Sequence, residues 1–152
     1  GRFQDLDIRS VINNIEESGI EVIANYLFGL PGDSFESMNR TLQLSLELCT
    51  TAWNGYPAMA LPGSQLYKEA RKKGYELPAT YAGYSFLGYD TVPLPTDHLT
   101  PAQVLEFRDH AFVTYHSAPR FQEKVRRRFG SKALENINKM LEVKIQRRLL
   151  QN

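Results

Sequence analysis

The turn from Gly29 to Ser34 combines residue types that often surround a bound ligand. Gly29 and Gly32 let a ligand approach the backbone closely, and Asp33 places a carboxylate at the start of a helix whose first amides carry partial positive charge. The Lys-Ser/Thr pair of a phosphate loop is missing, and Pro31 has no amide hydrogen to donate. The turn therefore suits a ribose hydroxyl or an amino group better than an anion. The alternative is that the glycines and Asp33 only shape the turn and cap the helix.

A second turn of the same kind, from Ala58 to Ser64, lies about one strand-plus-helix repeat further along the chain. Both turns contain Leu-Pro-Gly, at 30–32 and 61–63, although chance use of a common turn tripeptide would give the same pattern. The second turn has no ionisable group. Tyr56 and Met59, just before it, could stack on a planar ring, but side chains of this kind in a strand more often belong to the core.

Cysteine and histidine chemistry is limited. Cys49 is the only cysteine, which excludes an internal disulfide, a thiolate zinc site and an iron–sulfur cluster built from this chain alone. We expect an inert core thiol there and a reducing, cytoplasmic compartment. His98, His110 and His116 have no partner at the spacing of metal ligands, and helical positions six apart point roughly 120° away from each other. We therefore expect no metal site, and no residue can be assigned as a catalytic acid or base.

Basic residues gather near the carboxyl end, although 18 Lys and Arg against 17 Asp and Glu leave a net charge of only +1. Such a run could bind RNA, and it comprises Lys124, Arg126, Arg127, Arg128, Arg147 and Arg148. Val125 and Phe129 form an apolar stripe on the same helix, so we favour a solvated face and no nucleic-acid partner. No apolar run reaches the roughly 20 residues that span a bilayer, so no membrane contact is expected.

The elements that would position the two turns can be predicted from periodicity. A first helix runs through Ile8 to Ile15, with Asp5 or Asp7 as cap and Gly19 as stop. A strand at 20–28 is apolar throughout, which is typical of a parallel strand buried on both faces. Asp33 and Glu36 form a predicted capping box for the next helix, whose apolar face carries Phe35, Met38, Leu42, Leu46 and Cys49.

The remaining elements follow in the order strand, helix, connector and helices. A second strand covers 52–59, and a short helix at 64–73 ends at Gly74. The connector 78–99 is rich in Tyr, Gly and Pro, and a third, short strand could form at 84–89. Thr100 to Gln103 starts a helix with a capping box and Pro at the first position. After Pro119 we predict a helix ending at Gly130 and a last helix from Ser131 that buries Leu134, Ile137, Met140, Leu141, Ile145 and Leu149.

The stretch from Gly19 to Ser34, GIEVIANYLFGLPGDS, resembles the radical S-adenosylmethionine superfamily, and is most similar to members with a cobalamin-binding domain ahead of the barrel. Leu27 matches the aliphatic position of that family's fifth-strand motif, Gly29 its second glycine, and Asp33-Ser34 the acidic-hydroxyl pair of a Leu-Pro-Gly-Glu-Thr-like turn. Asn25 stands where a first glycine is usual. The stretch Tyr56 to Tyr67 resembles the sixth strand and its continuation, and Leu99 to Arg148 resembles the helical region that follows.

The resemblance implies an S-adenosylmethionine site across the carboxyl ends of the strands. Adenine would lie against Leu27 and the strand from Tyr56 to Met59, with the backbone from Gly29 to Gly32, including Leu30 and Pro31, and the Asp33 turn close to the nucleoside. The family's four-iron four-sulfur cluster needs a three-cysteine loop that this chain lacks, as it lacks the early strands and any cobalamin domain. None of these cofactors is expected to bind to this chain alone.

The sequence therefore predicts an α/β fold: an incomplete fragment of a (β/α) TIM-type barrel with two or three strands, followed by an α-helical tail. The predicted regions are barrel units at 1–77, a connector at 78–99 and a helical region at 100–152. We interpret the chain, which begins at Gly1, as the carboxyl-terminal part of a radical S-adenosylmethionine enzyme that is inactive alone, with the preceding barrel strands as its partner. The alternative is a non-catalytic protein- or RNA-interaction module, which could self-associate through open strand edges.

Overall fold

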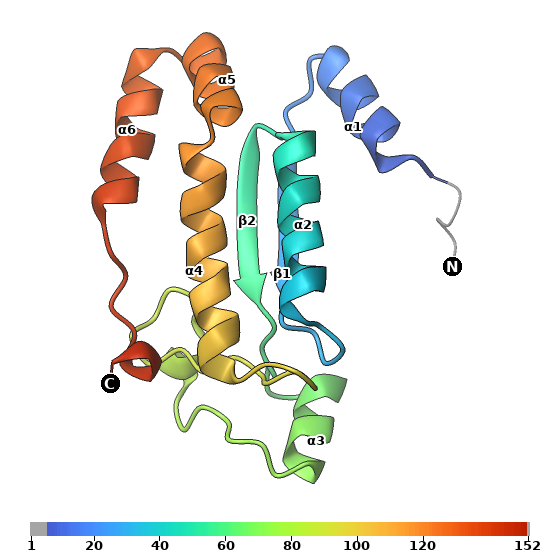
Figure 1. Cartoon of the computed structure of the whole chain (residues 1–152), viewed down its shortest axis with the longest axis vertical. Helices are drawn as coiled ribbons and strands as arrows, with labels where there is room; N and C mark the ends of the chain where they lie inside the picture. Colours follow the sequence, from blue (N-terminus) through green and yellow to red (C-terminus); the bar gives the residue numbers. More distant parts are fainter. Residues whose placement is uncertain (1–5, 152) are drawn as a thin grey trace.

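The computed structural model describes residues 6–151 and contains a two-stranded sheet with helices on one side of it (Figure 1). The chain order is α1 (Ile8–Glu17), β1 (Ile23–Phe28), α2 (Phe35–Leu48), β2 (Ala52–Pro57), α3 (Gln65–Lys72), the 3₁₀ helix η1 (Tyr81–Tyr84), α4 (Pro101–Ser117), α5 (Pro119–Phe129), α6 (Ser131–Glu142) and the 3₁₀ helix η2 (Arg148–Leu150). A mixed α/β fold is thus confirmed. None of the described helices is long and apolar enough to cross a membrane.

The strands β1 and β2 are parallel, with Ile23 opposite Ala52 and Phe28 opposite Pro57. Helix α2 connects them, and α2 and α4 lie side by side over the same face of the sheet (Figure 1). The predicted burial of the first strand on both faces is wrong. Tyr26 and Phe28 are buried under the helices, whereas Leu27 between them is 54% exposed. The reason is that no described helix covers the second face, so alternate side chains are mostly exposed in β1 and partly exposed in β2.

The larger of two apolar clusters joins the predicted barrel units to the helical tail. The indole of Trp53 lies at its centre, stacked on the Tyr115 ring of α4 with centroids 5.4 Å apart and on the Tyr26 ring of β1 at 6.0 Å. The Tyr115 hydroxyl donates a hydrogen bond of 2.8 Å to the buried carbonyl of Thr50, which fixes the end of α4 beside the start of β2. Buried residues of α4 and α5 therefore belong to the same core as those of the strands.

The predicted caps of α1 and α4 agree with the structure, whereas that of α2 does not. Asp7 caps α1, while the alternative cap Asp5 lies outside the described residues. Thr100 and Gln103 form the predicted capping box of α4. In α2, however, the N-cap is Ser34 and its capping partner is Ser37, so the predicted box of Asp33 and Glu36 is wrong. Asp33 lies one residue before this N-cap, and its carboxylate accepts a hydrogen bond from the Gly29 amide, which closes the turn.

The connector 78–99 contains η1 and no strand, so the third strand proposed at 84–89 is not formed among the described residues. Its second half is held against both turns at the carboxyl ends of the strands. The Leu94 amide donates to the Ala58 carbonyl at 2.9 Å, and the Asp97 amide donates to the Pro31 carbonyl at 2.8 Å. Beyond the carboxyl ends of the two strands, these carbonyl groups are thus satisfied by isolated hydrogen bonds from the connector and not by a further paired strand.

The last predicted helix is too long. Helix α6 ends at Glu142, and the chain then continues in extended conformation to η2. Ile145 and Leu149 are only partly buried, whereas Arg147 between them is 3% exposed. The Arg147 side chain binds Asp109 on α4 and the Gly88 carbonyl of the connector. The ion pair with Asp109 thus holds this segment outside the helix. The apolar pattern of the sequence could not predict this contact, because Asp109 is distant along the chain.

Candidate functional site

The open face of the sheet brings together two of the predicted site residues. Leu27 and Tyr56 are direct neighbours in the β1–β2 register, and both side chains lie on the uncovered face. Below them, Asn54 donates a side-chain hydrogen bond of 3.1 Å to the amide oxygen of Asn25. The face therefore combines exposed apolar surface with one amide pair, a surface on which a planar, partly polar group could stack.

The turn after β1 is closed by its own aspartate. One carboxylate oxygen of Asp33 accepts the amides of Gly29 and Leu30 at 3.0 and 2.9 Å, and the other accepts the Ser37 hydroxyl at 2.7 Å. Because three hydrogen bonds already engage this carboxylate, its observed work is to shape the turn. The alternative interpretation of Asp33, as a turn-forming residue, thus has direct structural support.

The two glycines of this turn differ in what requires them. Gly29 has φ of +82°, and a Cβ added there would collide with a side-chain methyl of Val104 on α4. Both the backbone conformation and the close approach of a helix therefore demand glycine at this position. Gly32 has no atom near the position of an added Cβ, and Leu30 is 42% exposed. Gly32, Leu30 and the half-buried Pro31 thus form the accessible part of the turn.

Tyr56 and Met59 lie on either side of the end of β2. The Tyr56 ring is half-buried because the connector covers one edge of it, with Phe86 in an edge-to-face contact at 4.8 Å between centroids. Met59 is also half-buried, and its carbonyl accepts the Leu61 amide in the second turn. The structure thus places Leu27, Tyr56 and the two turns at one end of the open face, with Met59 just beyond it.

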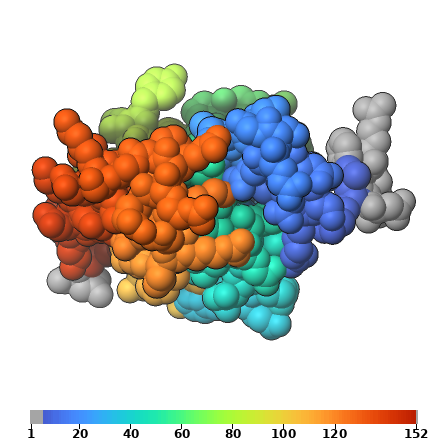
Figure 2. Space-filling model, turned by 90° about the horizontal axis from the view of Figure 1, so that it is seen from above, coloured from blue at the N-terminus to red at the C-terminus, as the bar shows by residue number. Residues whose placement is uncertain are grey.

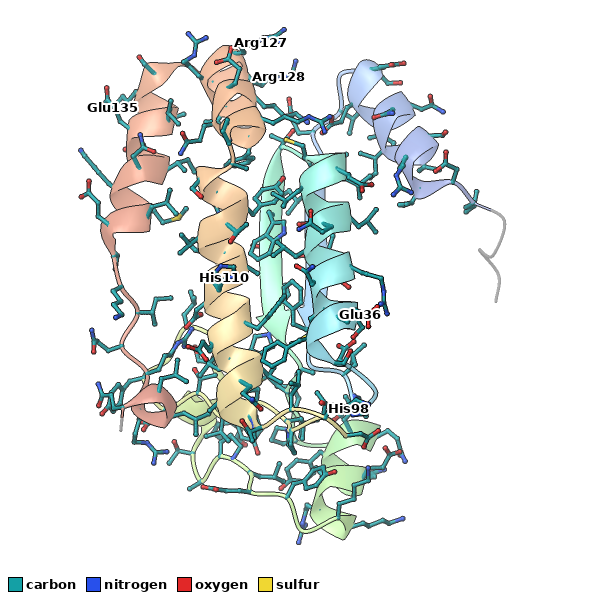
Figure 3. The ribbon with its side chains drawn as sticks, in the orientation of Figure 1. Glu36, His98, His110, Arg127, Arg128 and Glu135 are labelled. Atoms are coloured by element: carbon teal, nitrogen blue, oxygen red, sulfur yellow. The ribbon has the colours of Figure 1, made fainter. Side chains whose placement is uncertain are left out.

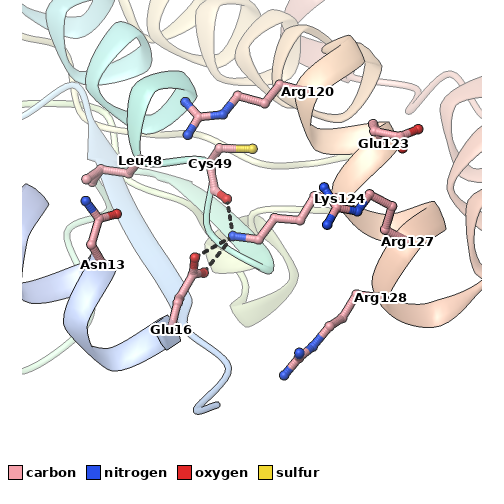
Figure 4. Close-up of a pocket in the computed structure, with 9 residues that line it drawn as sticks. All are labelled: Asn13, Glu16, Leu48, Cys49, Arg120, Glu123, Lys124, Arg127 and Arg128. Atoms are coloured by element: carbon pink, nitrogen blue, oxygen red, sulfur yellow. Dashed lines mark hydrogen bonds and ion pairs between the residues drawn. The ribbon is translucent and has the colours of Figure 1, made fainter. Parts of the chain in front are cut away.

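A cavity of about 510 Å³ lies at the opposite, amino end of the sheet, between α1, the end of α2 and α5 (Figure 4). Lys124 crosses it, donating to the Glu16 carboxylate at 2.6 and 2.7 Å and to the Cys49 carbonyl at 2.7 Å. Arg120 donates to the Glu47 carbonyl at 2.7 Å. Seen from above, atoms of α1 (blue) and α5 (orange) lie on the same face of the molecule (Figure 2). Lys124 therefore acts as a bridge between these helices.

The basic run on α5 is largely paired with acidic residues. Besides Lys124, Arg126 pairs with Glu123 at 2.8 Å, and Arg128 pairs with Glu21, two residues before β1. Figure 3 shows Arg127 and Arg128 at the upper end of the molecule. Lys124, Arg126 and Arg128 thus have carboxylate partners within residues 6–151, which leaves little uncompensated charge for a phosphate backbone. Arg126, Arg127 and Arg128 are exposed, as predicted for a solvated face, and this face carries surface ion pairs.

The histidines lie in separate places. His110 lies on α4, and His98 lies at the far end of the molecule, near α3 (Figure 3). His116 is a core residue: its Nδ1 donates to the Phe112 carbonyl at 2.8 Å, its ring packs edge-on to Trp53, and burial lowers its pKa below the usual value. Across the described part of the chain, no group of three or more His, Cys, Asp or Glu side chains could hold a metal ion.

Cys49 occupies the C-cap of α2 in a left-handed conformation, with φ of 46°, and is 3% exposed. Burial is the main cause that raises the pKa of its thiol, outweighing the nearby positive charges of Arg120 and Lys124. A protonated, buried thiol is a poor nucleophile and a poor metal ligand. It also lies next to the amino end of β2, whereas the predicted site lies at the carboxyl ends of the strands.

Sequence reasoning missed a buried ion cluster formed by Arg108, Asp109 and Arg147. The Arg108 side chain lies against the covered face of the sheet, where its Nε donates to the Gly55 carbonyl at 2.8 Å. Asp109 accepts from Arg108 at 2.9 Å and from Arg147 at 2.8 and 2.9 Å. Burial is the main cause that lowers the pKa of Arg108. A signal existed, because Arg108 falls on the buried stripe of α4 together with Val104, Ala111 and Tyr115.

Comparison of the chain with models of protein families, with curated proteins and with solved structures found no match in any of the three. The function of the site must therefore be argued from its own geometry.

Proposed function

We propose that this chain forms the last strand–helix units of a (β/α) barrel in a radical S-adenosylmethionine enzyme, with the open face of its sheet turned toward the barrel interior. The observation that carries the proposal is the placement of helices on only one face of a parallel sheet. In a (β/α) barrel the helices form the outer layer and the opposite face of every strand points inward. A parallel pair of strands with an uncovered, partly apolar second face is the arrangement that such a fragment would have.

The position of the predicted residues supports a nucleoside site at this end of the sheet. Leu27 and Tyr56 are adjacent on the open face, and the accessible backbone of Leu30 to Gly32 lies directly beyond them. Ligands of open and closed α/β sheets bind at the carboxyl ends of the strands. We infer that Leu27 and Tyr56 would pack against the adenine, while Asp33 holds the turn in shape.

The residues present do not fit the iron–sulfur cluster of that family. A four-iron cluster is held by cysteine thiolates, and Cys49 is the sole cysteine, buried at the amino end of the sheet. This chain would therefore contribute no cluster ligand, and no radical step can be assigned to its residues. Its share in the parent protein would be to bind and orient the nucleoside and to exclude water from one side of the barrel.

The test is calorimetric titration of S-adenosylmethionine into this chain and into a longer chain that includes any strands encoded before Gly1. We expect binding by the longer chain only. Leu27→Glu in the longer chain should weaken binding at least tenfold, because it places a charge on the proposed adenine surface. Leu6→Glu is the matched control, since Leu6 is exposed to a similar extent, 57% against 54% for Leu27. Failure of both chains to bind, or tight binding by this chain as a monomer, would contradict the proposal.

A second candidate is a non-catalytic module that associates through the same face. It is favoured by the same exposed apolar surface, which includes Ile23 at 63% exposure, and by the free outer edges of β1 and β2. Sedimentation would show a dimer that Leu27→Glu dissociates and Leu6→Glu does not. For RNA, binding that falls steeply with salt would be required, and the ion pairs on α5 argue against it.

A further inference from the structure

A second cavity, of about 700 Å³, lies apart from the one beside Lys124, between α4 and the segment from Met140 to Gln151. The size falls in the range of sites for small molecules. The apolar part of its lining includes side chains of α4, of the end of α6 and of the segment after it, among them Phe112, Val113, Met140, Leu141, Val143 and Ile145. The cavity is separate from the open sheet face, because α4 lies between the two.

The floor of this cavity holds two buried cations and one anion. Arg108 and Arg147 are 2% and 3% exposed, and both lie in the lining together with Asp109. Asp109 is the only carboxylate that pairs with either arginine within residues 6–151. The two buried arginines and the half-buried Asp109 therefore carry a net charge of +1. At the rim, the exposed Glu106 and Lys144 offset each other, and His110 is the remaining titratable group.

The two arginines differ in how fully their donors are used. Arg147 donates through Nε and Nη2 to Asp109, and through Nη1 to the Gly88 carbonyl at 2.9 Å and the Thr91 hydroxyl at 3.1 Å. Arg108 donates through Nε to Gly55 and through Nη1 to Asp109. Among the described residues its Nη2 has no acceptor, and its guanidinium lies 5.3 and 5.4 Å from the Phe86 and Phe112 rings.

An uncompensated buried charge is unfavourable unless an opposite charge and hydrogen-bond acceptors complete it. A carboxylate has the geometry that a guanidinium binds best, with two acceptor oxygens in one plane. The surrounding apolar walls would cover a short hydrocarbon chain or ring attached to that carboxylate. The enclosed volume is too small for a folded partner and has too little positive charge for a polynucleotide.

We propose that the cavity between α4 and the segment Met140 to Gln151 binds a small amphipathic carboxylate, whose charged end faces Arg108 and whose apolar body lies against Val113, Met140 and Val143. The site is independent of the proposed barrel interior. Arg147 acts as a positioning residue, because it holds Asp109 and the carboxyl segment that forms one wall.

The experiment uses a set of probes with one shape and different charge: 4-phenylbutyrate, 4-phenylbutan-1-ol and 4-phenylbutylamine, each titrated into the whole chain by calorimetry and followed by amide chemical shifts. The acid should bind with Kd of about 1 mM or tighter, a value in keeping with a ligand of this size. The alcohol should bind more weakly, and the amine at least tenfold more weakly than the acid. The shifts should map to α4 and to residues 140–151.

Val113 provides a matched pair of variants, since it lines the cavity and is 49% exposed, so that a polar residue there does not require a change in the core. Val113→Glu should weaken binding of the acid at least fivefold by repulsion, and Val113→Gln less than twofold. Equal binding of acid and amine, no binding up to about 10 mM, or shifts on the sheet face would overturn the proposal. So would a dimer that Val113→Glu dissociates, because a second copy of the chain would then occupy the cavity.

Discussion

The two faces of the sheet carry side chains from the same strands, yet they have different physical roles. Phe28 is fully buried beneath α2 and α4, whereas Leu27, its neighbour in sequence, is 54% exposed on the other face. The covered face packs against aromatic rings of α4 within the main apolar core, and so contributes strongly to the free energy of folding. The open face provides little to this chain alone. Burial within one strand therefore separates residues that hold the fold from residues available to a ligand or partner.

The comparison can be broken most directly by truncating neighbouring side chains. Phe28→Ala should lower the free energy of unfolding by about 3–5 kcal/mol, because it removes a fully buried ring and leaves a cavity. Leu27→Ala should change it by less than about 0.5 kcal/mol, as expected for an exposed site. Urea denaturation followed by tryptophan fluorescence measures both. Equal losses would mean that the second face is covered in solution.

A substitution in the ion cluster of Arg108, Asp109 and Arg147 should have the next largest effect on the free energy of unfolding. Arg147→Met removes two hydrogen bonds to Asp109 and leaves the Gly88 carbonyl and the Thr91 hydroxyl without this donor, so we expect a loss of roughly 3 kcal/mol. The matched control is Arg148→Met, because the pair of Arg148 with Asp90 lies at the surface. Exposed pairs contribute under about 1 kcal/mol. A loss for Arg147→Met no greater than that of the control would show that the buried cluster contributes nothing to stability.

The turn at the edge between the two faces can be tested through its glycines. Gly29→Ala should cost about 2 kcal/mol or more, because it combines a positive φ with a collision against Val104. Gly32→Ala should cost under about 1 kcal/mol, because the space around it is open. Thermal unfolding separates the two variants. If both were tolerated equally, the packing of α4 on this turn could not be what requires Gly29.

The smallest expected effect is the contribution of the buried His116 to the pH dependence of stability. Burial lowers the pKa of His116, so the folded chain keeps this ring neutral below the usual value of 6.5. As the pH falls through that value, the unfolded chain binds a proton that the folded chain does not, and stability is lost. Urea midpoints at about pH 7.5 and 5.5 should therefore fall more in the native chain than in His116→Gln. His98 and His110 are present in both chains, so their contributions cancel; identical falls would contradict a buried neutral His116.

Local patterns predicted most element positions. Capping and proline signals placed the start of α4 at Pro101, and the apolar repeats found α1, α2, α3 and α5. These features depend on contacts between residues a few positions apart, which the sequence displays directly. The expectation that Leu27 and the strand from Tyr56 share one site came from the family resemblance, whereas their adjacency in the register is a finding of the structure.

Other features depend on contacts between distant residues. Asp33 could cap α2 or close the turn by sequence, and only the position of the Gly29 and Leu30 amides decided between these roles. The charge of Arg147 predicted exposure, but Asp109 on α4 draws it into the interior. In both cases the residue type alone did not determine the position of the side chain, and hydrogen bonds to particular partners did.

The sequence by itself determined that β1 and β2 are apolar parallel strands joined by a helix, because strand composition and turn glycines are local properties. Only the tertiary structure decided that one face of the sheet is open. That depends on α2 and α4 packing on the same face, which leaves the other face without a described helix. The tertiary structure also decided that Arg108 is buried, because a charged residue on an apolar stripe can be accommodated only when Gly55 and Asp109 supply its acceptors.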